Sequence, residues 1–262
     1  MTSLAIAEWK QFRRNKVILS MVLITALGVP ALMMGTLSTD TPEDARASGG
    51  IALELFLLLA ALLVLYYSVL SMTTTRRDEG VLKRLRTGEA TDVQILMAIC
   101  APSTIFVLIA GIAMPGLVLA MGSAIPVNPA LYVVALVLSV VVAASLAFIT
   151  SAFTKNAEAA QITSMPIVVL GMASQSGVRG LMPDNAQQII DNTPFALLMD
   201  LVNLGWSGNP GAIVLSGTDA GFTPMAAGDV WQEGGIMVAK LLAWCVVLVV
   251  AAKHYMQWET RR

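Results

Sequence analysis

The placement of the basic residues between long apolar runs constrains this chain more than any other feature. Five runs are long enough to cross a bilayer and a sixth is shorter; they cover residues 17–37, 50–74, 93–121, 130–154 and 235–252, with 157–174 as the short one. A spanning helix needs about 20 mostly apolar residues. With six crossings, thirteen of the sixteen Lys and Arg residues fall on one side, and only Arg46, Arg179 and Lys240 do not. The positive-inside rule then predicts that both termini are cytoplasmic.

Composition leaves no room for a soluble module of useful size. The chain is 56% hydrophobic and 13% charged, whereas a soluble domain has about 25% charged residues. We therefore expect an all-α integral membrane protein with six transmembrane helices, forming a single domain over residues 1–262. Residues 175–234 should hold short helices that dip into the outer leaflet or lie on it, followed by an exposed outer loop, because irregular backbone at that depth needs a protein or water cover.

Two cytoplasmic segments have the character of surface helices. Residues 1–16 combine an aromatic residue suited to headgroup depth with charges; the residues of interest are Glu8, Trp9, Lys10, Arg13 and Arg14. In residues 76–90, helical spacing gathers Val81, Leu82 and Leu85 on one apolar face, opposite a basic face. Such a helix docks a partner or anchors on lipid. The alternative for both segments is that their charges only set the topology.

Glu54 and Lys240 are the only charges well inside the expected spans, each five or six residues from the outer end of its helix. A charge in the bilayer costs at least about 2.5–3.5 kcal/mol, so each needs a partner or a wet cavity. We expect the two to pair or to line the outer exit of a path. Alternatively, Lys240 extends to the surface and Glu54 lies among headgroups.

Several kinds of chemistry are excluded by the residues themselves. The chain has no G-x-x-x-x-G-K-(S/T) phosphate loop, so it cannot bind ATP in that manner. Its single histidine, His254, rules out a metal site built on two histidines. The basic residues are spread along the membrane surface, which does not suit nucleic-acid binding. We therefore expect no catalytic residue, bound cofactor or metal in this chain.

Three motifs resemble those of ABC-2 type transporter permeases, the membrane subunits of drug, polysaccharide and lipid exporters that include the daunorubicin-resistance type. The family's R-(D/E)-E-G-(T/V)-L-(K/E)-R-L-R signature is matched by Arg77, Asp78, Glu79, Gly80, Val81, Leu82, Lys83, Arg84, Leu85 and Arg86. The segment from Ala7 to Lys10, with Arg13 or Arg14, is similar to its interface helix. Leu181-Met182-Pro183 and Asn192-Thr193-Pro194-Phe195 are similar to its outer element between spans five and six.

The resemblance implies a coupling helix at residues 76–90 that enters the groove of a separate ABC ATPase subunit, present in two copies. It also implies a second permease subunit, ATP and Mg on the ATPase, and a multi-pass protein of the bacterial plasma membrane. The expected function is export of an amphiphilic drug, natural product or lipid. Two alternatives remain open: a membrane sensor or immunity protein that docks a cytoplasmic partner, and an ion-coupled secondary transporter.

Overall fold

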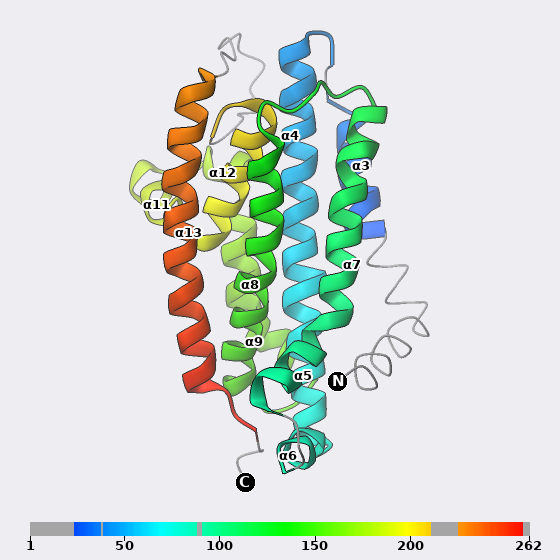
Figure 1. Ribbon diagram of the computed structural model, residues 1–262, viewed down its shortest axis with the longest axis vertical. Helices are drawn as coiled ribbons and strands as arrows, with labels where there is room; N and C mark the ends of the chain where they lie inside the picture. Colours follow the sequence, from blue (N-terminus) through cyan, green and yellow to red (C-terminus); the bar gives the residue numbers. More distant parts are fainter. Residues whose placement is uncertain (1–23, 38, 88–90, 211–224, 259–262) are drawn as a thin grey trace.

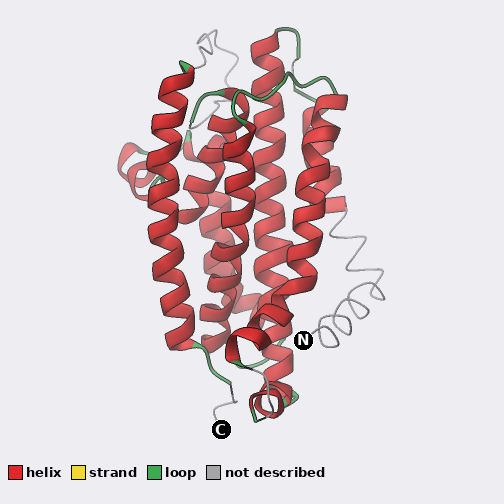
Figure 2. Cartoon of the chain, viewed as in Figure 1, coloured by secondary structure: helices red, strands yellow, loops and turns green. Residues whose placement is uncertain are grey.

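The computed structural model describes residues 24–37, 39–87, 91–210 and 225–258, and all regular structure in those ranges is helical (Figures 1 and 2). Four helices are long and apolar enough to cross a membrane: Pro42–Asp78, α7 (Asp92–Ala120), α8 (Pro129–Phe153) and α13 (Ala227–Tyr255). They overlap the expected spans 50–74, 93–121, 130–154 and 235–252. The all-helical membrane architecture is therefore confirmed, with four candidate spans among the described residues.

Within the part of the chain that the structure describes, neither of the other two expected spans forms a single long helix. Residues 17–23 lie outside the described part of the chain, which begins with a π-helical turn, η1 (Ile24–Gly28), followed by α3 (Val29–Met34). The segment 157–174 forms α9 (Ala159–Ala173). Its length is about 22 Å at 1.5 Å per residue, which is less than the hydrocarbon thickness of about 30 Å.

The longest helix joins three segments without a break: α4 (Pro42–Leu59), η2 (Ala60–Tyr67) and α5 (Ser68–Asp78). Its central segment η2 is π-helical and mostly buried. There the Tyr66 hydroxyl donates a hydrogen bond to Thr150 Oγ1 on α8, at 3.2 Å. A wide π turn inside a long helix is uncommon and often marks a functional position.

Threonine side chains fix where several helices begin. Thr41 accepts a hydrogen bond from the backbone N–H of Asp44 at the start of α4, at 3.1 Å. Thr91 and Gln94 form a reciprocal capping box at the start of α7. Each cap satisfies backbone donors that the first helical turn leaves without partners. The chain can therefore start these helices at defined positions.

The centre of the bundle at one end is filled by α12 (Pro194–Ser207), all fourteen residues of which are buried. It packs against α4, α8 and α13, and Figure 1 shows it in the upper half of the bundle. Before it come two short helices, α10 (Ser176–Arg179) and α11 (Asp184–Ile190), and α11 has no buried residue. The short helices expected within residues 175–234 therefore include α12, and protein covers α12 on all sides.

The two ends of the bundle differ, and we name each by its short helix. At the α6 end, α5 leads into α6 (Val81–Arg86), seen at the bottom of Figure 1. At the α12 end, α12 finishes against the loop between α7 and α8, where the Asn128 N–H donates to Gly205 O at 2.7 Å. The candidate functional residues divide between these ends.

Candidate functional site

At the α6 end, a left-handed glycine separates α5 from α6. Glu79 caps α5, and Gly80 has φ +67°, a backbone conformation that side chains disfavour. The expected helix 76–90 is therefore divided: residues 76–78 finish α5, α6 contains only six residues, and residues 88–90 lie outside the described part of the chain. The turn at Gly80 lets α6 leave the direction of the long span.

The two faces of α6 follow the spacing predicted from the sequence. Leu82 is fully buried, and Leu85 packs against the core in a half-buried position. Lys83, Arg84 and Arg86 are exposed. A six-residue helix has little intrinsic stability, so burial of Leu82 holds it on the bundle while its cationic face stays accessible.

Arg77 turns inward, away from that accessible face. Its guanidinium is buried and donates to three backbone carbonyls at the end of α8: Ser151 O at 2.7 Å, Thr154 O, and Lys155 O at 3.5 Å. The last carbonyls of a helix lack partners within the helix and attract a cation. Arg77 is thus part of the predicted motif, but it joins the end of α5 to α8 and does not lie on a docking surface.

Further contacts tie α6 to the neighbouring helices. Arg86 Nε lies 3.4 Å from Asp92 Oδ1 at the start of α7. The same guanidinium lies 5.2 Å from the ring centre of Trp258, just beyond α13. Each exposed ion pair contributes little to folding stability. These contacts therefore orient α6 more than they stabilise it. The interface-helix residues Glu8, Trp9, Lys10, Arg13 and Arg14 lie outside the described residues.

At the α12 end, Glu54 on α4 is fully buried and accepts three hydrogen bonds. They come from the Ser176 backbone N–H and hydroxyl, both at 2.6 Å, and from Asn203 Nδ2 at 2.8 Å. These donors lie on α10 and α12, so the carboxylate links three helices. Three donors compensate part of the cost of burying a carboxylate.

Lys240 lies apart from Glu54 and has a different partner. Its Nζ donates to Asn192 Oδ1 at 3.3 Å, and Trp244 Nε1 donates to the backbone carbonyl of the same Asn192 at 2.9 Å. The structure therefore does not bring the two intramembrane charges together as an ion pair. It assigns Glu54 to the interior and Lys240 to the exposed side of α13.

Arg179 is a buried charge that sequence reasoning missed as a site residue. It forms two hydrogen bonds with Asp200 on α12, one of 3.0 Å to Oδ2 and a second to Oδ1, and one of 2.7 Å with Asp191. Burial alone would lower the pKa of Arg179, but these two carboxylates outweigh it and raise the pKa. One feature of the sequence could have pointed to Arg179 as a site residue: it is the only basic residue between α9 and α12.

A second hydrogen-bond network lies at the carboxyl end of α12. Trp206 Nε1 donates to Ser123 Oγ at 2.9 Å, and the Ser123 hydroxyl donates to Ala45 O at 3.0 Å. Gly49 makes this approach possible, because a Cβ there would lie 2.1 Å from Ser123 Oγ and 2.4 Å from Trp206 Nε1. Helices α4 and α12 are thereby held at close range.

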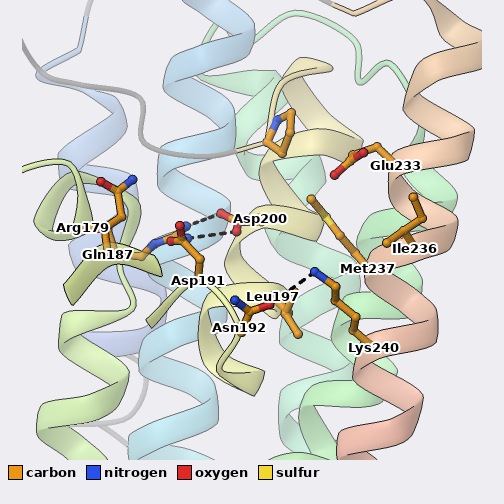
Figure 3. A pocket seen from close by; sticks show the side chains of 11 residues that line it. Arg179, Gln187, Asp191, Asn192, Leu197, Asp200, Glu233, Ile236, Met237 and Lys240 are labelled. Carbon is orange, nitrogen blue, oxygen red and sulfur yellow. Dashed lines mark hydrogen bonds and ion pairs between the residues drawn. The ribbon is translucent and has the colours of Figure 1, made fainter. Parts of the chain in front are cut away.

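Beside these networks, a pocket of about 270 Å³ opens between α13 and the segment from α10 to α12 (Figure 3). Its lining combines both signs of charge with apolar side chains: Arg179, Gln187, Asp191, Asn192, Leu197, Asp200, Pro210, Glu233, Ile236, Met237 and Lys240. No group of three or more metal-ligating side chains occurs within the described residues.

Comparison with known proteins gives one family match. The model of the family described as ABC-2 type transporter matches residues 1–225. That range includes α6, α12 and most of the pocket lining. A search of curated proteins finds no match for this chain.

Proposed function

The chain belongs to the ABC-2 type transporter family, and from that membership we propose that it exports an amphiphilic substrate using ATP hydrolysed by a separate subunit. It is the membrane subunit of such a transporter, and ABC-2 permeases function with ABC ATPase partners. The substrate class we propose is a drug, natural product or lipid. The spans offer few polar side chains for a hydrophilic channel, which favours an amphiphile.

The observation that carries the proposal is the construction of α6. A short helix with exposed Lys83 and Arg84 is held to the bundle by buried Leu82 and begins at the turn of Gly80. We propose that this cationic face docks into an ATPase subunit. The motif residues that act at the contact are then the exposed ones, while Arg77 passes the movement on to α8.

The charge distribution supports an orientation. Basic side chains gather at the α6 end, where the positive-inside rule places the cytoplasm; they are Arg76, Lys83, Arg84, Arg86, Lys155 and Lys253. We propose six crossings of the bacterial plasma membrane with cytoplasmic termini. The fifth crossing would then be a broken one, formed by α9 from the α6 end and continued by α12 toward the α12 end.

In the proposed mechanism, two ATPase subunits close on ATP and push on the α6 helices of two permease subunits, identical or related. The push reaches α8 through Arg77, whose hydrogen bonds span the junction. The spans then rock to open a path between the permeases. ATP can drive this movement only to the extent that it binds one conformation better than the other.

The test is co-purification of the ATPase from the native membrane in mild detergent. We expect an ATPase with wild type and at least about a tenfold loss with Lys83→Glu/Arg84→Glu, since charge reversal at a contact costs more than about 1.4 kcal/mol. Lys155→Glu, an exposed charge at the same end, is the control and should keep the ATPase. An ATPase that is absent from wild type, or retained by the double variant, would overturn the proposal.

A further inference from the structure

One stripe of α13 presents two opposite charges to the pocket at the α12 end. Glu233, Ile236, Met237 and Lys240 follow the i, i+3, i+4, i+7 spacing of one helix face, and all four line the pocket. The two charged residues are two helical turns apart, about 10 Å along the axis. Figure 3 shows their side chains at opposite ends of the pocket, with Met237 between them.

The Glu233 carboxylate and the Lys240 ammonium can each form further hydrogen bonds. An ammonium carries three donors, but Lys240 makes one hydrogen bond, of 3.3 Å. Among the described residues, no hydrogen bond or ion pair is found for the Glu233 carboxylate. Arg179 is already committed to Asp200 and Asp191, although its buried Nε lacks an acceptor. The pocket therefore offers a ligand one accessible cation and one accessible anion.

The order of the charges along α13 matches the build of a zwitterionic phospholipid. Glu233 lies nearer the α12 end, and Lys240 lies deeper. Beyond Lys240 the same side of α13 is apolar and exposed, with Val247 57% and Val250 62% accessible. A lipid in the outer leaflet carries its amine outermost, its phosphate deeper and its chains deepest. Trp244, bonded to Asn192 O, suits the boundary between headgroups and chains.

We propose that this pocket binds the headgroup of an amphiphile that carries a phosphate and a primary ammonium, such as an ethanolamine phospholipid. Lys240 and Asn192 bind the phosphate, Glu233 accepts hydrogen bonds from the ammonium, and the chains lie along Val247 and Val250. The inference rests on the proposed function, which makes the α12 end the outer side. It narrows the amphiphilic substrate to a headgroup class.

Headgroup chemistry gives the inference a specific signature. A choline headgroup has no N–H to donate to Glu233, and a glycerol headgroup has no cation to face it. The full chain, purified in detergent, is titrated with dioleoyl phosphatidylethanolamine, phosphatidylcholine and phosphatidylglycerol, and with phosphoethanolamine lacking chains. Native mass spectrometry reports the affinity for the first molecule bound. The variants are Lys240→Gln, Glu233→Gln and the charge-keeping Lys240→Arg, with Lys253→Gln and Glu158→Gln as exposed controls at the α6 end.

We expect wild type to prefer the ethanolamine lipid over both others by about tenfold, as one charged hydrogen bond implies. Lys240→Gln should weaken ethanolamine and glycerol lipids alike, whereas Glu233→Gln should weaken only the ethanolamine lipid. Lys240→Arg and both controls should resemble wild type. Equal affinity for the three lipids, an equal effect of Glu233→Gln on all of them, or binding of phosphoethanolamine as tight as that of the lipid would overturn the inference.

This measurement needs neither ATP nor the ATPase. A chain that keeps its lipid preference but lacks an ATPase would overturn the proposed function alone. A chain that retains the ATPase but shows no preference would overturn the headgroup site alone.

Discussion

Arg77 shows how a buried charge is tolerated when backbone carbonyls surround it. Its three acceptors, at Ser151, Thr154 and Lys155, are the carbonyls that close α8. Removing the guanidinium would take its donors away from these carbonyls and leave the site without a cation, although Ser151 O would keep the hydrogen bond from the Thr154 N–H. The neighbouring Arg76 is less buried, and its guanidinium lies 3.9 Å from the carboxylate of Glu79. The two adjacent arginines therefore provide a matched pair.

Arg77→Ala should lower the free energy of unfolding by about 2 kcal/mol, since a hydrogen bond to a charged group contributes about 1.5–3 kcal/mol. Arg76→Ala should lower it by less than about 1 kcal/mol, as for exposed ion pairs. Unfolding in mixed micelles with increasing SDS measures both. Equal losses for the two variants would show that the α8 contact does not stabilise the junction.

Glu54 acts differently, because it joins segments from three parts of the chain. Its donors Ser176 and Asn203 lie 122 and 149 residues away in sequence. Glu54→Gln replaces one acceptor oxygen with an NH₂ group that faces donors, so we expect a loss of about 2 kcal/mol. Asn203→Ala, which removes one of the three donors, should cost about 1 kcal/mol.

The same SDS titration tests Glu54, with the exposed Glu43 of α4 as control. Glu43→Gln should change stability by a few tenths of a kcal/mol, the size of a helix-dipole effect. A Glu54→Gln variant as stable as Glu43→Gln would mean that the buried network does not hold α10 and α12 against α4.

At the scale of elements, the turn before α6 depends on one glycine. A Cβ at Gly80 would meet nothing within 4 Å, and the same is true of Gly116 on the exposed side of α7. Of these two glycines, Gly80 has a positive φ and Gly116 does not. The two positions therefore separate backbone strain from crowding.

Gly80→Ala should cost about 1–2 kcal/mol, because an alanine disfavours the left-handed conformation. Gly116→Ala should be neutral or stabilise α7 by up to about 1 kcal/mol. If α6 docks the ATPase, Gly80→Ala should also reduce co-purification of that subunit, and Gly80→Asn should do so less. Retention of the ATPase by Gly80→Ala at the level of Gly116→Ala would argue against a role for this turn.

The short helices also show where sequence reasoning succeeds and where it fails. The faces of α6 follow from local spacing, so Leu82 and Lys83 could be placed correctly. The division at Gly80 was missed because an isolated glycine is tolerated within a helical segment, and its positive φ cannot be seen in the sequence. Burial of α12 on all sides was only partly foreseen: Asp200 and Asn203 suggest a wet face, and their partners Arg179 and Glu54 come from other helices. Pairings over such distances leave no local pattern.

For the whole molecule, hydropathy predicted the four long helices because each contains a window that is apolar on every side. It could not show that a short α9 is followed by a separate, buried α12. In the proposed topology these two helices complete one broken crossing. Covering α12 with α4, α8 and α13 satisfies the rule that interrupted backbone in a membrane must be shielded. The orientation of the bundle then decides which end meets the ATPase.

Accessibility of introduced cysteines tests this orientation and the broken crossing together. The native Cys100 and Cys245 are half-buried and buried, and both are replaced by alanine as background. Reporters are exposed positions: Ile125→Cys and Asn185→Cys at the α12 end, and Thr87→Cys and Lys155→Cys at the α6 end. An impermeant maleimide should label the first two in intact cells. It should label the other two only after permeabilisation, because basic ends remain cytoplasmic.

Asn185 is the decisive reporter, since it lies on α11 between the two halves of the proposed crossing. Labelling of Asn185→Cys together with Ile125→Cys means that α9 has carried the chain to the outer side. The buried 14-residue α12 then completes the broken crossing toward the outer end. Labelling of Asn185→Cys with Lys155→Cys instead would mean that the chain has not crossed by α11. The break between α9 and α12 would then open to the cytoplasm, and the outward-facing headgroup site near Lys240 would have to be abandoned.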